Sequence, residues 1–290
     1  TIFSVSRAGD VSLFRKQIFF MITGLVPFAI FFAVPPFVLK RASPFFYFLN
    51  LGLLLAVELV GETGKGAQRW IDLKFMQFQP SELSKILVVL TLSAFFAARQ
   101  EDVKKFSTFA LSFLHILPSL ILIFRQPHLG ATLTILVSWM VICIVARVPW
   151  KTITFTVLAV AAVGVFAVKT PGVLNEYQMK RLQDLVVSDP RTTGYQQFQA
   201  EIAIGTGGIE GKGYLRGDRK SMQVVPEQHN DFVFTVVGEE GGLFGSALVL
   251  FTFAAFFLRG WYLAYQMEDG FSRTATLGVL SALAFHWVVN

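Results

Sequence analysis

Residues 226–240 read Pro-Glu-Gln-His-Asn-Asp-Phe-Val-Phe-Thr-Val-Val-Gly-Glu-Glu, and this stretch leads directly into the apolar segment 232–258. Asp231 occupies the place of a helix N-cap, where a carboxylate accepts the free N–H groups of the first turn. Glu239 and Glu240 follow about two turns later, roughly 12 Å along the helix axis. If the segment spans a membrane, these carboxylates must be paired or functional, because an isolated charge is costly there.

The composition of the chain predicts a membrane protein. Of its 290 residues, 54% are hydrophobic and 15% are charged, whereas an average soluble domain has about 25% charged residues. Several long runs contain no charge, so we expect an all-α, polytopic transmembrane helix bundle that forms one integral membrane domain over residues 1–290. The net charge of +6 is spread over loops without interleaved aromatic residues, which argues against a nucleic-acid partner.

Eight apolar segments are expected to cross the membrane, and the three prolines of the first predict a kink in it. The segments comprise residues 18–39, 45–60, 80–98, 106–124, 129–146, 152–168, 232–258 and 274–290. Polar residues fill a loop at 61–79 and one large extracytoplasmic loop at 169–230.

Basic residues in the short loops predict the orientation of the bundle. We expect the tight basic turns to lie in the cytoplasm, namely those with Lys40, Arg41, Arg99, Lys104, Lys105, Arg147, Lys151, Arg259 and Arg273. The polar stretches 61–79, 125–128 and 169–230 then share the outer face. The three most unusual polar parts of the sequence are therefore predicted to converge on one side of the membrane.

The glycine-rich run at 205–213, Gly-Thr-Gly-Gly-Ile-Glu-Gly-Lys-Gly, looks like a phosphate-binding loop but does not match one. A P-loop needs Gly in place of Thr206 and Ser or Thr in place of Gly213, and a dinucleotide-binding turn needs Gly in place of Glu210. A flexible re-entrant turn is the preferred interpretation. Its N–H groups and Lys212 remain a candidate site for an anionic head group.

Further candidates lie in the polar stretches. Arg69 and Trp70 combine a base with an aromatic ring, which suits a lipid-linked phosphate or sugar, although tryptophan is also common at membrane interfaces. Glu227 and His229 precede Asp231 in the same loop, and His229 is a candidate for orienting a substrate or for a loop role. None of the four histidines has a metal-ligand spacing to another His or Cys, so no metal site is predicted.

Charged residues inside the apolar segments have a structural interpretation as well as a functional one. Glu82 and Lys85 lie three positions apart and therefore on one face of their helix. For Glu239 and Glu240, the structural alternative is that Glu239 pairs with Lys85 inside the membrane. Asp231 would then be a surface acid or a plain N-cap.

A set of motifs in a fixed order runs along nearly the whole chain. They are 66–71 (Gly-Ala-Gln-Arg-Trp-Ile), 78–82 (Phe-Gln-Pro-Ser-Glu) with Lys85, 126–130 (Gln-Pro-His-Leu-Gly), 189–190 (Asp-Pro), 194–196 (Gly-Tyr-Gln), 202–208 (Ile-Ala-Ile-Gly-Thr-Gly-Gly), 211–217 (Gly-Lys-Gly-Tyr-Leu-Arg-Gly), 226–232 and 238–240. In these motifs the chain resembles the SEDS family (RodA/FtsW; shape, elongation, division and sporulation proteins). The run 211–217 is more similar to the elongation (RodA) branch than to the division branch.

The sequence departs from the family pattern at three positions. His128 stands where the family usually has Asp, Asn230 where it has Thr, and Lys74 where it has Gly. The family has about ten spans, and we expect about eight here, because the first span and the last one or two are missing. We therefore expect a chain that is truncated at both ends.

The resemblance implies a peptidoglycan glycosyltransferase that polymerises lipid II at the outer face of the bacterial cytoplasmic (inner) membrane, in cell elongation or division. It assigns the general base to Asp231, which would take the proton of the acceptor's 4-hydroxyl during inverting transfer from undecaprenyl pyrophosphate. Arg69, Lys85 and Lys212 become candidates for phosphate contacts, and Trp70 becomes a candidate for a lipid or sugar contact.

The resemblance also extends the substrate-binding set to Glu82, Glu227 and His229. A divalent cation, Mg²⁺ or Mn²⁺, would share the pyrophosphate charge, and a class B penicillin-binding protein transpeptidase is the implied partner. Two other functions stay open. The chain could be a flippase for a lipid-linked precursor, with intramembrane charges along a path, although the sequence shows no internal repeat of the kind common in transporters. It could also be a non-catalytic scaffold for a transpeptidase.

Overall fold

The structure, a computed structural model, describes residues 12–64, 67–72, 77–126, 128–170, 195–217 and 232–289. The chain divides into two compact units. Unit 1 contains Thr1–Ala33, Met179–Phe256 and Asn290, and unit 2 contains Val34–Gln178 and Phe257–Val289. Each unit holds its own group of candidate residues.

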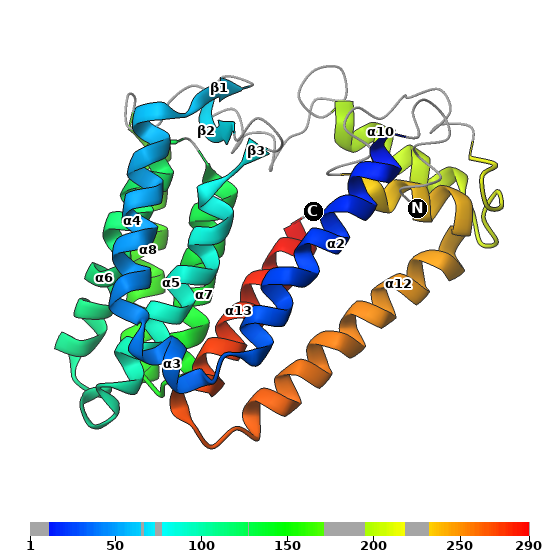
Figure 1. Cartoon of the computed structure of the whole chain (residues 1–290). Helices are drawn as coiled ribbons and strands as arrows, with labels where there is room; N and C mark the ends of the chain where they lie inside the picture. The colour runs from blue at the N-terminus through cyan, green and yellow to red at the C-terminus, as the bar shows by residue number, and fades with distance from the viewer. Residues whose placement is uncertain are drawn as a thin grey trace. The chain divides into compact units, whose positions relative to one another are not determined.

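Unit 2 is a helix bundle arranged around α5 (Pro80–Ala97) (Figure 1). Its other helices are α3 (Pro36–Arg41), α4 (Ser43–Val60), the short 3-10 turn η1 (Gln100–Asp102), α6 (Phe106–Arg125), α7 (Leu129–Val145), α8 (Trp150–Lys169) and α13 (Gly270–Val289). Helix α5 contacts α4, α6, α7 and α13 and is the most deeply buried of the long apolar helices. Pro80 lies in its first turn, where the N–H that proline lacks would have no helical partner anyway.

The interior of unit 2 combines apolar packing with buried polar pairs that join neighbouring helices. Asn50 Nδ2 donates to Ser119 Oγ over 2.9 Å and links α4 to α6. Trp139 Nε1 donates to Ser112 Oγ over 3.0 Å and links α7 to α6. Hydrogen bonds between spans satisfy polar groups that lipid cannot satisfy, so these pairs help to fix the order of the helices in the bundle.

Residues 61–79 contain a small sheet, although the sequence predicted an irregular loop. Strand β1 (Glu62–Gly64) pairs antiparallel with β2 (Ala67–Asp72), and β2 pairs antiparallel with β3 (Gln77–Phe78). Strand β2 also contacts α4 and α5, so the sheet covers one end of these two helices (Figure 1). Strands β1 and β3, with three and two residues, are too short to leave a period-two pattern in the sequence, which explains why these two were not predicted.

Unit 1 contains α2 (Ser12–Ala33), α10 (Tyr195–Thr206) and most of α12 (Val233–Tyr265). Helix α10 lies inside the stretch that was predicted as the loop 169–230, so part of that loop is helical. Helix α12 is not continuous, because Gly242 has non-helical backbone angles (φ 60°, ψ −154°). A glycine tolerates this positive φ, which most other residues avoid.

The prediction of a polytopic membrane protein with an all-α bundle is confirmed. Five helices of the described part are long and apolar enough to cross a membrane, namely α2, α4, α5, α6 and α12, and α7 and the part Trp150–Phe166 of α8 are shorter apolar stretches. The first expected span, 18–39, ends earlier than predicted and is divided at Pro35 into α2 and α3. Pro27 lies within α2, so the adjacent prolines Pro35 and Pro36 cause the break.

Candidate functional site

Arg69 links strand β2 to the turn between α6 and α7. Its Nε donates to the carbonyl oxygen of Gln126 over 2.9 Å. The side chain of Gln126 is buried, and its Nε2 donates to the carbonyl oxygen of Leu54 over 3.2 Å. The polar stretches 61–79 and 125–128 therefore meet, as their predicted placement on one face requires. Gln126 was predicted only as part of a motif. A glutamine at the end of an apolar span is the sequence signal for this buried amide.

Lys85 lies in the second turn of α5 and is paired with Glu82 of the first turn. Its Nζ lies 2.7 Å from Glu82 Oε2, and the side chains are 10% and 47% exposed. The prediction that these two residues share one helix face is confirmed. The carboxylate of Glu82 holds the buried ammonium of Lys85 in a fixed position at this end of the bundle.

His128, at the start of α7, contacts the segment that begins α5. Its Nδ1 lies 3.1 Å from Ser81 Oγ and 3.4 Å from Gln79 Nε2. Burial lowers the pKa of His128 to about 4, and the neighbouring positive charge of Arg69 acts in the same direction. The imidazole is therefore neutral at pH 7, and no negative charge replaces the Asp that the family usually carries here.

Trp70 is partly buried and pairs with Glu62 in the β1–β2 ladder. It follows Arg69 directly in the strand, and successive side chains of a strand point to opposite faces. Arg69 is directed toward Gln126, so Trp70 is directed away from that face. The base and the ring therefore do not act on one face as predicted, because the strand separates them onto two faces.

Unit 1 contains the second group of candidates, around the glycine-rich run. Lys212 Nζ lies 2.9 Å from Glu239 Oε1, and the Glu239 side chain is completely buried. The predicted structural alternative had Lys85 as the partner of Glu239, whereas within unit 1 the carboxylate pairs with Lys212, and Lys85 pairs with Glu82 of its own helix. The N–H groups of Lys212 and Gly213 donate to backbone carbonyls of α12. These two N–H groups are thus not available to an anionic head group, contrary to one interpretation of the run.

Three predicted residues, Glu227, His229 and Asp231, lie outside the described residues. The described part resumes at Phe232, whose carbonyl oxygen accepts both from the Thr235 N–H at 3.0 Å and from its hydroxyl at 2.6 Å. Helix α12 then begins at Val233. In sequence, residue 231 directly precedes this first turn.

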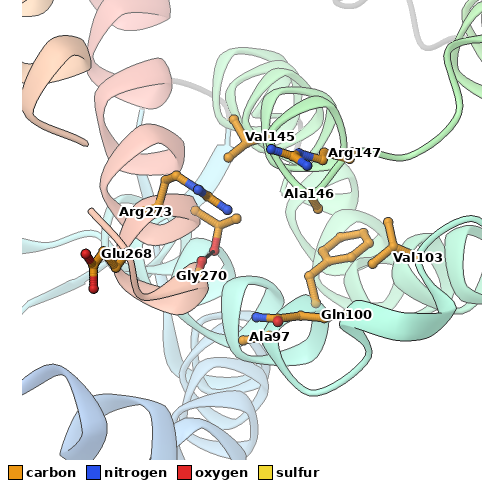
Figure 2. A pocket seen from close by; sticks show the side chains of 11 residues that line it. Ala97, Gln100, Val103, Val145, Ala146, Arg147, Glu268, Gly270 and Arg273 are labelled. Carbon is orange, nitrogen blue, oxygen red and sulfur yellow. Dashed lines mark hydrogen bonds between the residues drawn. The ribbon is translucent and has the colours of Figure 1, made fainter. Parts of the chain in front are cut away.

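A separate cavity of about 290 Å³ lies at the other end of unit 2, between the ends of α5 and α7 and the start of α13. Arg147 and Arg273 are directed into it from two sides (Figure 2), and Glu268 is the one carboxylate among its lining residues. Lys85 is twelve residues before the end of α5, roughly 18 Å along the helix axis. The cavity is therefore distinct from the Arg69–Lys85 region, and it contains none of the predicted site residues.

Carboxylate, imidazole and thiolate groups do not gather into a metal site in the described part of the chain. No group of three or more His, Cys, Asp or Glu residues lies close enough there to hold a metal ion. The positive charge of the site in unit 2 comes from Arg69 and Lys85.

These features define a polytopic membrane protein whose apolar helices α5 and α12 carry ion-paired residues. A family model described as cell cycle protein, which covers FtsW, RodA and SpoVE, matches residues 2–290. The chain belongs to this family. It is 32% identical over 283 residues to the peptidoglycan glycosyltransferase MrdB of Escherichia coli (strain K12), covering 97% of this chain and 76% of MrdB. A probable peptidoglycan glycosyltransferase FtsW of Geobacter sp. (strain M18) is 31% identical over 288 residues, covering 95% of this chain and 75% of that protein.

Comparison with solved structures also supports membership of this family. One similar chain belongs to a study titled "Structural coordination of polymerization and crosslinking by a peptidoglycan synthase complex". It has a TM-score of 0.78 and 28% identity and covers 96% of this chain and 77% of that chain. The rod shape determining protein RodA of Thermus thermophilus has a TM-score of 0.69 and 25% identity, covering 100% of this chain and 78% of that chain. The resemblance to RodA and FtsW that the motifs indicated is confirmed.

Proposed function

We propose that this chain is a peptidoglycan glycosyltransferase that polymerises lipid II at the outer face of the bacterial inner membrane during cell elongation. The observation that carries the proposal is the 32% identity over 97% of the chain to a protein named peptidoglycan glycosyltransferase MrdB. The likeness to a rod shape determining protein supports the elongation branch. The positive charges of Arg69 and Lys85 support a substrate that carries a pyrophosphate.

The proposed reaction forms one bond and breaks one. The oxygen of the acceptor's 4-hydroxyl bonds to the anomeric carbon of the donor sugar. The bond between that carbon and the pyrophosphate oxygen breaks, and the electron pair leaves with undecaprenyl pyrophosphate. The configuration at carbon is inverted, and the hydroxyl proton passes to the carboxylate of Asp231. We assign this role to Asp231 from its place in the family motif, directly before α12.

The described residues with positive charge fit the leaving group in this scheme. Lys85 is fixed by Glu82 at 2.7 Å before any substrate binds, so little reorganisation is needed when negative charge develops. Arg69 is held through its Nε by the carbonyl oxygen of Gln126, and a guanidinium carries five N–H donors in a fixed fork. We assign Trp70 to a lipid or sugar contact.

Glu227 and His229, in the polar loop before α12, are assigned to positioning the acceptor. A divalent cation such as Mg²⁺ or Mn²⁺ would supply extra positive charge and would need oxygen ligands. The described residues offer no cluster of acidic or histidine ligands for it.

Paired intramembrane charges weigh against the flippase alternative. Lys85 contacts Glu82, and Lys212 contacts Glu239, each within its own unit. A path for a charged head group would need polar groups that face an open route. Partnership with a class B penicillin-binding protein remains part of the proposal, and it is supported by the similarity to a chain of a peptidoglycan synthase complex.

The test is polymerisation of purified lipid II by the reconstituted protein, alone and with a class B penicillin-binding protein. We expect the wild type to form glycan strands and Asp231→Ala to form none. Asp102→Ala is the matched control, because Asp102 is an exposed acid that pairs with Lys105 at the surface, and it should keep wild-type activity. Wild-type rates for Asp231→Ala would remove Asp231 as the base, and absence of polymer from the wild type under both conditions would refute the proposed activity.

A further inference from the structure

The break in α12 would leave four backbone groups without helical partners. In a continuous helix the carbonyls of Glu239 and Glu240 accept from the N–H groups of Leu243 and Phe244, four residues later. The non-helical angles of Gly242 prevent both bonds. Unpaired backbone groups are strongly unfavourable in a membrane, so such a break persists only where other protein groups replace the lost partners.

The glycine-rich run replaces the donors of both lost bonds. The Lys212 N–H donates to the Glu239 carbonyl over 3.0 Å. The Gly213 N–H donates to the Glu240 carbonyl over 3.0 Å. Both carbonyls at the end of the first half of α12 are thus satisfied by one short stretch of chain.

The same run replaces the acceptors. The Leu243 N–H donates to the Gly208 carbonyl over 2.9 Å. The Phe244 N–H donates to the Ile209 carbonyl over 3.4 Å. We call this arrangement of residues 207–213 against residues 238–244 the glycine clasp, since it restores four hydrogen-bonding groups at the two sides of the break.

Glycine is required in the clasp because the two chains approach too closely for side chains. A Cβ on Gly211, which has a φ of +79°, would lie 2.2 Å from the Glu240 carbonyl oxygen. A Cβ on Gly207 would lie 2.0 Å from the Gly238 carbonyl oxygen. The glycines that look like a phosphate loop in the sequence therefore serve backbone packing.

The ion pair between Lys212 and Glu239 adds a side-chain interaction to the glycine clasp. Lys212 reaches from the run to Glu239, whose buried carboxylate also lies against Gly217, where a Cβ would be 2.8 Å from Oε2. A buried carboxylate needs such a partner, because burial without one is highly unfavourable. The pair thus ties the run to the last turn of the first half of α12, Val233 to Glu240.

We propose that Lys212 is a positioning residue for the glycosyl transfer and acts through Glu239. It holds the half-helix 233–240 in place, and this half-helix carries Asp231 at its N-terminal side in the sequence. The inference rests on the proposed function and changes the role of Lys212, which the sequence suggested as a phosphate contact. Displacement of a base by about 1 Å lowers the rate of catalysis even when substrate binding is unchanged.

The test compares Lys212→Met, Glu239→Gln and the double variant in lipid II polymerisation. We expect Lys212→Met to lower the rate at saturating lipid II about 10- to 100-fold with little change in KM. We expect the double variant to recover much of this loss, because no buried charge is then left without its partner. Lys212→Arg should retain most of the activity. If Lys212 instead contacts the donor phosphate, Lys212→Met raises KM and the double variant is at least as impaired as Lys212→Met.

A second measurement keeps the inference testable without turnover. Hydrogen exchange at the N–H groups of Leu243 and Phe244 reports directly on the clasp, and we expect it to accelerate in Lys212→Met and to return in the double variant. Lys105→Met, which removes an exposed lysine of the surface pair with Asp102, is the matched control and should change neither exchange nor rate. Unchanged exchange in Lys212→Met would overturn the inference. An inactive wild type with the expected exchange pattern would refute the proposed function and leave the clasp intact.

Discussion

The two Lys–Glu pairs in the described part of the chain have opposite patterns of burial. In unit 2, Lys85 is 10% exposed and Glu82 is 47% exposed. In unit 1, Glu239 is fully buried and Lys212 is 26% exposed. The first pair lies within one helix turn, whereas the second joins residues 27 positions apart. The first pair therefore presents a buried cation at the end of a helix, and the second fixes a loop to a broken helix.

Loss of Lys212 is expected to have the largest effect on stability. Lys212→Met leaves the Glu239 carboxylate buried without this ammonium, and breaking a buried pair in this way costs about 3–5 kcal/mol. Unfolding of the purified protein in detergent, followed by denaturant titration, would measure the loss. Adding Glu239→Gln should restore most of the lost stability. A double variant as unstable as Lys212→Met would show that the effect does not come from this charge pair.

The backbone of the clasp provides the next prediction. Gly211→Ala places a methyl group against the Glu240 and Gly241 backbone at a positive φ, and we expect a loss of about 2–3 kcal/mol. Gly205→Ala is the matched control in the same run, since nothing lies within 4 Å of a Cβ at that position. The control should be neutral or slightly stabilising, because alanine favours the helix α10 in which Gly205 lies. Equal effects of the two substitutions would contradict the clasp.

Protonation of His128, which lies near the Lys85–Glu82 pair, should lower the stability of the fold in acid. The imidazole takes a proton near pH 6.5 in the unfolded chain, but burial and the charge of Arg69 lower its pKa to about 4 in the folded protein. Between these values the unfolded state binds more protons, so stability is full above about pH 6.5 and falls as the pH approaches 4. We expect this group to contribute on the order of 1–2 kcal/mol after screening by solvent. His128→Gln should reduce the pH dependence by this amount, and an unchanged slope would contradict the assignment.

The sequence predicted the local features of the molecule better than the distant ones. The apolar segments predicted the helices, and a spacing of three residues predicted that Glu82 and Lys85 share a face. The sequence did not predict the partner of Glu239, because the two residues are 27 positions apart and at that separation chain entropy gives little preference among many possible partners.

The sequence also did not predict the role of the glycine-rich run. A glycine-rich run can donate its N–H groups either to a phosphate or to the carbonyl oxygens of another chain segment. Which of the two occurs depends on whether another segment lies close to the run. The break at Gly242 provides that segment, since the carbonyls of Glu239 and Glu240 beside it accept from the run. We expected a continuous helix there, because the segment 232–258 is apolar on both sides of the break.

Loss of Glu82 is expected to lower the stability of the fold least among the four changes. Glu82 is half exposed, and a screened pair of this kind is worth about 1 kcal/mol or less. Glu82→Gln keeps a hydrogen-bonding group beside Lys85, so stability in detergent should change by no more than this amount. The same variant should still lower lipid II polymerisation, because Lys85 is then less firmly placed for the leaving pyrophosphate. Glu82 differs from Glu239 most clearly in this variant, because removal of the exposed acid Glu82 should affect the reaction more than the fold. A large loss of stability in Glu82→Gln would show that both pairs serve mainly to hold the structure together.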